Sequence, residues 1–399
     1  MATSATVLAG EIIDTNPHTR VPWTIWAGVA AITSASIGGA WDVAWHRSIG
    51  RDSFLSAPHL AIYACGVIAA VVCGYLIFYT TFGSSSRLRS QSVSVLGFHA
   101  PLGAFIAAWG GIAMIVSAPF DNWWHAAYGL DVKIISPPHT LLILGVRAVS
   151  VGVIFLVLAA LNRAEAQGEN SLEDSARHRV LQRIFLYLGG LMVTGQMFFL
   201  LEETWDVELH GTGAYIAMGI ALPVVFAVLH RASGSRWACT IAALVYTAFA
   251  LAEIWLFPLV PATPKLGPVY NVVTHLIPAK FPILIVIPAL VLDLLWSRMR
   301  GWKAWQIAAV SGVVFIAVLT AVEWPFASFL LSKASENRFF GTIYFDYNSR
   351  INGPDRMRQF INVSHGARLW NGLAMASACA IVSAWIGLTF GNWMKRVQR

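Results

Sequence analysis

The sequence contains one set of potential metal ligands twice: an Asp, a His four residues later, and a second His after a short spacer. The two sets are Asp42, His46 and His59, and Asp121, His125 and His139. Residues four apart lie on one face of a helix, so each Asp and its first His can turn toward the same ion. The second His follows a Pro and is placed to open the next helix. Each stretch therefore predicts a three-ligand metal site of two imidazoles and one carboxylate.

Other residues of the two stretches recur with the ligands. The shared pattern is D-x-x-W-H-x-x-x-G-x-D and then, after a spacer, S-x-P-H. We expect Asp52 and Asp131, which end the first part, to hold a ligating imidazole through its other nitrogen. An Asp and a His at a helix end can also be explained as caps or as contacts with interfacial water. Ionisable residues at membrane depth are costly unless paired or liganded, so the repetition favours metal binding.

The ligand types narrow the choice of metal. Two imidazoles and one carboxylate suit copper, or non-haem iron with open coordination positions. The absence of Cys near the two motifs argues against a structural zinc or an iron–sulfur cluster. Haem is a poorer third choice, because the His pairs span hairpin turns and are not opposed within a bundle.

The composition indicates what kind of protein holds these residues. Of the 399 residues, 57% are hydrophobic and only 12% are charged, as is typical of a polytopic membrane protein. We therefore expect an all-α membrane protein with about ten transmembrane helices in five hairpins. The predicted spans are residues 22–45, 58–83, 98–120, 138–162, 181–204, 212–230, 237–257, 276–297, 303–325 and 369–392.

The distribution of charge predicts the orientation. More than half of the 27 Lys and Arg lie at the two termini and in the mostly short even-numbered connections. The positive-inside rule then places both termini in the cytoplasm and the metal motifs toward the external face. Topology accounts for the formal charge of +7, so nucleic acid is not an expected partner. We expect an integral protein of the bacterial inner membrane, surrounded by the lipid bilayer.

A third group of polar residues lies at the end of the fifth predicted helix. Asp206 and His210 repeat the four-residue spacing, but no second His follows them. Carboxylates at membrane depth form proton relays. The residues of this group that we regard as candidates for a second-shell position or for proton delivery are Glu202, Glu203, Asp206 and His210.

The two motifs resemble those of the C subunit of the particulate methane and ammonia monooxygenases, a family of copper-dependent membrane enzymes. The first family motif, D-x-x-W-H-x-x-I-x-R-D with a later His, matches Asp42, Trp45, His46, Ile49, Arg51, Asp52 and His59. The second matches Trp123, His125, Asp131, Pro137 and His139, with Asp121 where the family often has Asn. The resemblance covers mainly residues 40–145. Unlike the family subunit, this chain places its first motif at the end of its first predicted helix.

The resemblance implies a copper-dependent membrane monooxygenase, or a subunit of one, that oxidises a small apolar substrate such as a short hydrocarbon, or ammonia, with O2. It implies copper at Asp42, His46 and His59, and a second ion or an alternative position for the same ion at Asp121, His125 and His139. The second set is the catalytic one, and other membrane subunits are the expected partners. Non-haem iron remains the alternative metal. The alternative function is a membrane copper-binding or transport protein without oxygenase activity. Transporters carry ligands along a conduction path, whereas the ligands here gather at one predicted face.

The motifs also predict a division of the chain. Residues 1–162 hold the motif-bearing hairpins that resemble the monooxygenase subunit. Residues 163–399 form a further transmembrane bundle, which preserves only fragments of the repeat and is interpreted as a degenerate duplication or a fusion. This second part includes a long external connection at residues 326–368.

Overall fold

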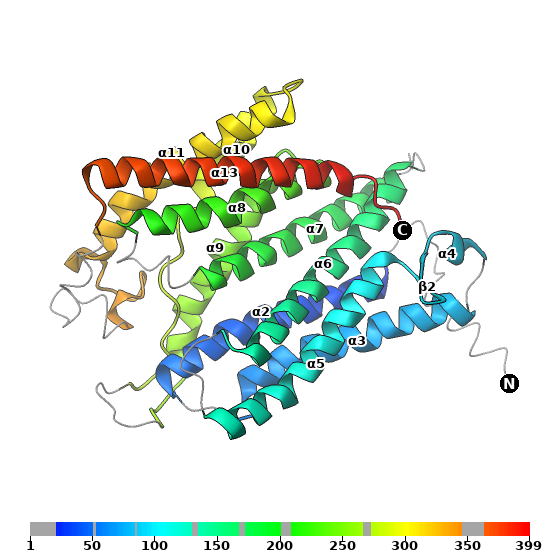
Figure 1. Ribbon diagram of the computed structural model, residues 1–399. Helices are drawn as coiled ribbons and strands as arrows, with labels where there is room; N and C mark the ends of the chain where they lie inside the picture. Colours follow the sequence, from blue (N-terminus) through cyan, green and yellow to red (C-terminus); the bar gives the residue numbers. More distant parts are fainter. Residues whose placement is uncertain are drawn as a thin grey trace. The chain divides into compact units, whose positions relative to one another are not determined.

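The computed structural model describes residues 21–50, 53–83, 86–129, 135–166, 172–200, 209–265, 273–344 and 363–399. Helices make up nearly all of the regular structure in these ranges (Figure 1). The only sheet among the described residues is a short hairpin of strands β1 (Val93–Val95) and β2 (Phe98–Ala100). The predicted all-α class is therefore confirmed.

The helices follow the apolar segments of the sequence closely. Their bounds are α2 (Trp23–Ser48), α3 (Ala57–Phe78), α4 (Ser86–Ser90), α5 (Leu102–Tyr128), α6 (Pro137–Ala166), α7 (Leu172–Phe199), α8 (Thr212–Ser233), α9 (Ala238–Leu256), α10 (Val286–Arg298), α11 (Ala304–Leu330) and α13 (Gly366–Met394). Within the described ranges, seven helices are long and apolar enough to cross a membrane: α3 with its following turn, α5, α6, α8, α9, α11 and α13. These seven helices indicate an integral membrane protein.

Helices α2 and α7, which overlap the predicted spans 22–45 and 181–204, are not among the seven, so the expected count of ten is not confirmed. The predicted span at 276–297 differs more strongly from the structure. We expected a helix at 276–297, but α10 begins only at Val286 and has 13 residues. A helix needs about 20 residues to cross a bilayer. The chain from 276 to 284 is extended or irregular. Pro278 and Pro282 explain the loss, because proline lacks a backbone N–H and disfavours the helical conformation in the residue before it.

The predicted connection at 326–368 also begins later than expected. Helix α11 continues to Leu330, and single turns follow at Lys333–Ser335 and Thr342–Tyr344. A proline inside the last turns of α11, Pro325, does not end the helix.

The chain divides into two compact units. Unit 1 comprises Met1–Ala35, Ala61–Leu188 and Lys395–Arg399, and unit 2 comprises Ser36–Leu60 and Gly189–Met394. All ligands of the first motif belong to unit 2, and all ligands of the second motif belong to unit 1. Each site can therefore be described within its own unit.

In unit 1, helices α5 and α6 run side by side (Figure 1). Glycines allow their backbones to approach: a Cβ added at Gly110 would lie 2.7 Å from the carbonyl oxygen of Gly145. Gly103 and Gly152 form a second close contact of this kind between the same two helices. Small residues at a helix interface permit this contact inside a membrane. The close packing fixes the direction of the two helices that carry the second motif.

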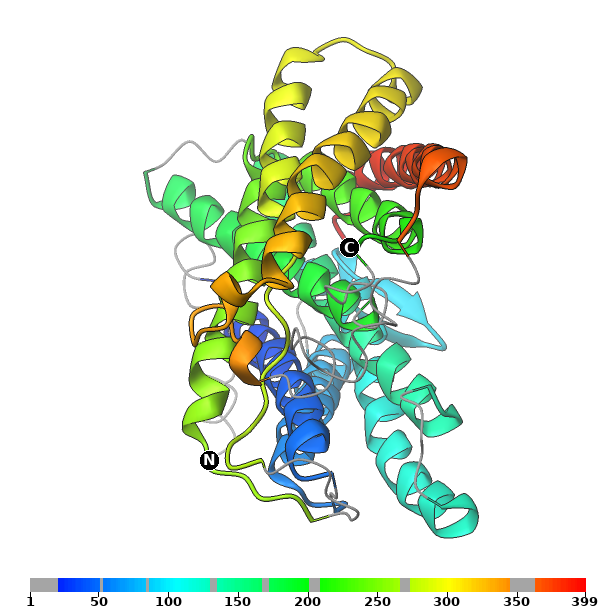
Figure 2. The same ribbon diagram turned by 90° about the vertical axis from the view of Figure 1, so that its left-hand side faces the viewer.

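In unit 2, α13 packs along α8 and α11, and α10 packs against α9 and α11. Figure 2 shows α10 and the beginning of α11, both yellow, lying next to each other. The end of α2 is held by a small core in which Ile49 packs with Ala262 and Leu276. The backbone N–H of Lys265 also donates to the Ile49 carbonyl at 2.9 Å. These contacts hold the helix end that carries the first motif.

Candidate metal centres

Each motif begins on a helix that a glycine ends. Gly50 has φ 80° and Gly129 has φ 89°, values that side chains with a Cβ rarely adopt. The N–H of Gly129 donates to the His125 carbonyl at 3.0 Å, and that of Gly50 donates to the Trp45 carbonyl at 3.2 Å. The glycine shared by the two motifs is therefore the residue that stops the helix four positions after the first His.

The second His of each motif is the third residue of the next helix. A Ser precedes that helix and a Pro lies in its first turn, which are the residue types preferred at these positions. The N–H of Leu60 donates to the Ser56 carbonyl at 3.0 Å, and that of Thr140 to the Ser136 carbonyl at 2.8 Å. The repeated S-x-P-H is thus a helix start that places a His in the first turn.

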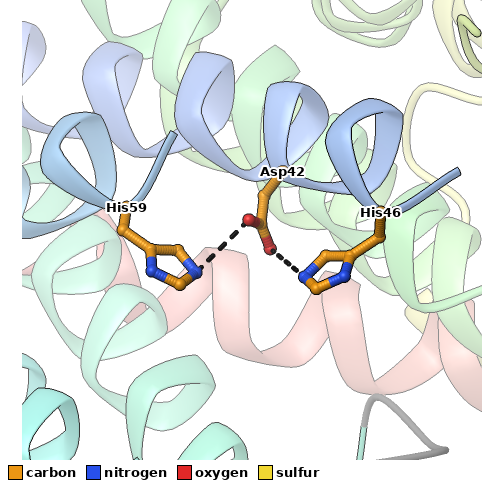
Figure 3. A group of neighbouring side chains, drawn as sticks. All are labelled: Asp42, His46 and His59. Atoms are coloured by element: carbon orange, nitrogen blue, oxygen red, sulfur yellow. Dashed lines mark ion pairs between the residues drawn. The ribbon is translucent and has the colours of Figure 1, made fainter. Parts of the chain in front are cut away.

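In the first site, Asp42 lies between two imidazoles and directs one carboxylate oxygen toward each (Figure 3). Its Oδ1 lies 3.3 Å from His59 Nε2, and its Oδ2 lies 3.8 Å from His46 Nε2. One ligand atom from each of the three residues falls within 4.8 Å of the others. The helix spacing and the turn therefore bring together the three predicted ligands.

The second site has the same construction in unit 1. Asp121 Oδ2 lies 3.4 Å from His125 Nε2, and Asp121 Oδ1 lies 3.4 Å from His139 Nε2. The three ligand atoms again lie within 4.8 Å of one another. The two imidazole rings have their centroids 6.3 Å apart, so they flank the carboxylate without stacking.

Backbone carbonyls orient one imidazole in each site. His59 Nδ1 lies 3.0 Å from the Ser53 carbonyl oxygen, and His125 Nδ1 lies 3.1 Å from that of Gly129. A carbonyl only accepts, so Nδ1 carries the proton in these contacts. In the neutral ring, Nε2 then presents its lone pair to the carboxylate, the arrangement that a metal-bound His needs.

The carboxylates provide a direct test of whether a cation fits. Asp42 Oδ1 and Asp121 Oδ1 are both buried, and neither makes a hydrogen bond within the described part of the chain. The two imidazoles whose Nδ1 is bound to a carbonyl, His59 and His125, face Asp42 Oδ1 and Asp121 Oδ2 with Nε2. A cation between the carboxylate oxygen and the Nε2 lone pair would stabilise this arrangement. Ligand atoms about 2.1 Å from one ion are separated by roughly 3–4 Å, and the Asp–His distances here are 3.3–3.8 Å. The donor set and its spacing fit a metal ion.

The sites differ in exposure. The His46 side chain is 49% exposed and that of His59 is 16% exposed, whereas the three ligands of the second site range from 20% to 31%. Three protein ligands leave coordination positions open for another molecule. Solvent therefore reaches the first site mainly at His46, whereas the three ligands of the second site are exposed to similar extents.

Aromatic residues surround the helix ends. Trp123 and Trp124 form a group with Phe120 and Tyr128 at the end of α5, with the Trp124 and Tyr128 centroids 4.5 Å apart. Trp45 instead packs against the core formed by Ile49, Ala262 and Leu276. The Trp of the second motif thus contributes to an exposed aromatic group, while that of the first supports the helix.

Most of the remaining predicted site residues cannot be assigned to either cluster or excluded from it. Asp52, Asp131, Glu202, Glu203 and Asp206 lie outside the described residues. His210 is described: it is 8% exposed, its Nε2 lies 2.9 Å from Ser328 Oγ, and its ring contacts that of Trp324. These contacts tie the start of α8 to the end of α11.

Sequence reasoning missed the two carbonyls that orient the imidazoles. They belong to Ser53 and Gly129, and a backbone oxygen leaves no residue type to recognise. In the second site the shared glycine was an available signal, because the carbonyl that His125 contacts is that of Gly129 itself.

Together, the helices and the two Asp–His–His clusters describe a protein of the membrane-spanning all-α class with two candidate metal centres. No family model, no curated protein and no solved structure matches the chain. The functional argument therefore rests on the sites themselves.

Proposed function

We propose that this chain is a copper-dependent membrane monooxygenase, or a subunit of one, that oxidises a small apolar substrate such as a short hydrocarbon, or ammonia, with O2. The observation that carries the proposal is the repeated cluster of one Asp and two His, each with a buried carboxylate oxygen that makes no hydrogen bond among the described residues. Two imidazoles and a carboxylate with open positions suit copper, with non-haem iron as the alternative. The shared accessory residues of the motifs support the choice of copper.

In this proposal each ligand set binds one metal ion. Asp42, His46 and His59 hold one ion, and Asp121, His125 and His139 hold a second. Bound copper would supply the redox chemistry that activates O2. The carbonyls of Ser53 and Gly129 keep the imidazoles in the orientation required for binding.

The reaction has a defined balance. One oxygen atom of O2 enters the substrate and the other leaves as water, with two electrons and two protons supplied by a reduced donor or partner subunit. We assign the motifs to the external side of a bacterial inner membrane, with both termini in the cytoplasm, because short Arg-rich connections favour that orientation. An apolar substrate would reach the helices through the bilayer.

Metal analysis of the purified full chain tests the ligand assignment. We expect copper in the wild type, with an EPR signal of nitrogen and oxygen ligation after oxidation. His46→Ala and His125→Ala should each bind less copper, whereas His365→Ala, which belongs to neither ligand set, should bind as much as the wild type. Equal copper in all four proteins would reject the assignment, and an iron signal would replace copper by non-haem iron.

A second measurement separates the oxygenase from the copper-binding alternative. The reconstituted protein is given a chemical reductant, isotopically labelled O2 and either a short alkane or ammonia. Label in the product, lost in His125→Ala, is the expected result. Tightly bound copper with no labelled product, together with copper uptake by protein-containing vesicles, would favour the transport function instead.

A further inference from the structure

The break before α10 leaves backbone groups that no helix pairs. Ile277 N–H donates to Ser48 Oγ at 2.6 Å, Ile283 N–H to the Tyr246 hydroxyl at 3.2 Å, and Leu284 N–H to Glu323 Oε2 at 2.8 Å. Irregular backbone at membrane depth is tolerated where protein groups satisfy it. The segment at 276–285 is therefore held by polar side chains from the helices around it.

Glu323 differs from the other two acceptors because it is ionisable. It lies in α11, is 0% exposed, and receives the Leu284 N–H on Oε2. Its second oxygen, Oε1, is also buried and has no hydrogen-bond partner within the described part of the chain. The carboxyl thus faces the beginning of α10 with Oε2 hydrogen-bonded and with Oε1 buried and without a hydrogen-bond partner among the described residues.

Tyr246 is the immediate neighbour of this carboxyl. The two side chains bind the N–H groups of consecutive residues, Ile283 and Leu284. The hydroxyl of Tyr246 accepts one N–H and retains its own proton for donation. Two other described ionisable groups interact electrostatically with Glu323 or Tyr246: Tyr215 of α8 and Glu253 of α9. Helix α13 contributes none, because it has no charged residue after Arg368.

Opposing effects act on the two forms of Glu323. Burial favours the neutral acid, because an ion loses its hydration there. The Leu284 N–H and the positive end of α10 favour the carboxylate. Among the described residues, the acid has no acceptor for a proton on Oε1, and the carboxylate has one donor, the Leu284 N–H.

We propose that Glu323 is a proton-exchanging residue, which takes up and releases a proton at Oε1 beside the broken helix of unit 2. The proton forms an O–H bond at Oε1 as it leaves a water molecule or hydroxyl donor, and it returns to such an acceptor on release. Oε2 keeps the Leu284 N–H in both forms. The site is independent of the metal ligands and does not rest on the proposed oxygenase activity.

Infrared spectroscopy of the full chain in lipid vesicles, recorded as a function of pH, tests this site. We expect a carboxylic-acid C=O band that appears and disappears with pH and shifts in deuterium oxide. Glu323→Gln should remove this band, since glutamine still accepts the Leu284 N–H but cannot exchange a proton. Tyr246→Phe should change the frequency of the band, because it removes the neighbouring hydroxyl.

The matched control is Asp293→Asn in the same unit. Asp293 is 1% exposed, but both its oxygens are bound, by the N–H groups of Cys239 and Thr240 and by the Thr240 hydroxyl. This variant should keep the Glu323 band. An unchanged wild-type band in Glu323→Gln would overturn the proposal. So would a band that responds to sodium at constant pH, which would make the site a cation site. If Glu323→Gln does not fold, the Tyr246→Phe shift decides, and no shift rejects the proposal.

Discussion

Each candidate metal centre depends on the orientation of an imidazole by a main-chain oxygen. His125 Nδ1 is bound by the carbonyl of Gly129, which has φ 89°. The glycine has two separate roles: its backbone conformation ends the helix, and its carbonyl turns Nε2 of the ring toward Asp121. A side chain at this position should disturb both.

Gly129→Ala should therefore weaken metal binding at the second site. A positive φ costs a residue with a Cβ about 1–2 kcal/mol, and the carbonyl is expected to move with the strained backbone. Loss of an outer hydrogen bond to a metal-bound His typically costs about 10–100-fold in affinity. Titration of the metal-free protein with copper, followed by EPR or calorimetry, measures the change.

Gly97→Ala is the matched control. Gly97 also has a positive φ, 84°, and at both glycines a Cβ would meet no atom within 4 Å. Gly97→Ala should lose about as much stability as Gly129→Ala. It should keep its copper affinity, because Gly97 lies in the β1–β2 turn and belongs to neither ligand set. An equal loss of affinity in both variants would show that Gly129 acts through general stability alone.

At the scale of the elements, the sites depend on how helix ends are held. The second site draws its ligands from α5 and α6, whose backbones approach through facing glycines. The first draws on α2 and α3, and the core around Ile49 holds the end of α2. Polar groups near a helix end thus become a site only where packing fixes that end.

Gly110→Ala should destabilise unit 1 and loosen the second site. The added Cβ would lie 2.7 Å from Gly145 O and 2.7 Å from Val149 N, so the helices must separate. Overpacking of this kind costs about 1–3 kcal/mol. We expect a lower unfolding temperature and weaker copper binding at the site of Asp121, measured by thermal unfolding and metal titration.

Gly74→Ala in α3 provides the comparison. A Cβ there would meet no atom within 4 Å, and alanine favours a helix over glycine by about 0.5–1 kcal/mol. This variant should be as stable as the wild type or slightly more so. If Gly110→Ala behaved like Gly74→Ala, the close approach of α5 and α6 would not be what holds the site.

At the scale of the whole molecule, each unit contains one complete ligand set. Asp42, His46 and His59 lie within unit 2, and Asp121, His125 and His139 lie within unit 1. Neither set needs a residue from the other unit to reach three ligands. Two ions per chain are therefore expected.

The copper stoichiometry should fall in steps. The wild type should bind two equivalents, His59→Ala and His139→Ala one each, and the double variant none. Energetic effects of separate sites add when they share no partners. Metal analysis after dialysis gives these values, and loss of both equivalents from either single variant would show that the two sets hold ions jointly.

The sequence by itself determined the residues of both candidate sites, because two local patterns carry the information. Spacing by four residues places Asp and His on one helix face, and S-x-P-H marks a helix start. Long apolar runs likewise predicted the helices, since only a helix satisfies its own backbone within a bilayer. Such features are local, and the local sequence specifies them.

Two other features, the broken helix before α10 and the buried carboxylate oxygens, depend on the tertiary structure alone. The extended segment before α10 exists because Ser48, Tyr246 and Glu323, all distant in sequence, satisfy its backbone N–H groups. An apolar run with two prolines is compatible with a kinked helix or a broken one, and only these partners distinguish the two. Asp42, Asp121 and Glu323 each have one buried oxygen without a hydrogen-bond partner in the described part of the chain. The sequence does not reveal such oxygens, because hydrogen bonding and burial depend on neighbours in the folded chain.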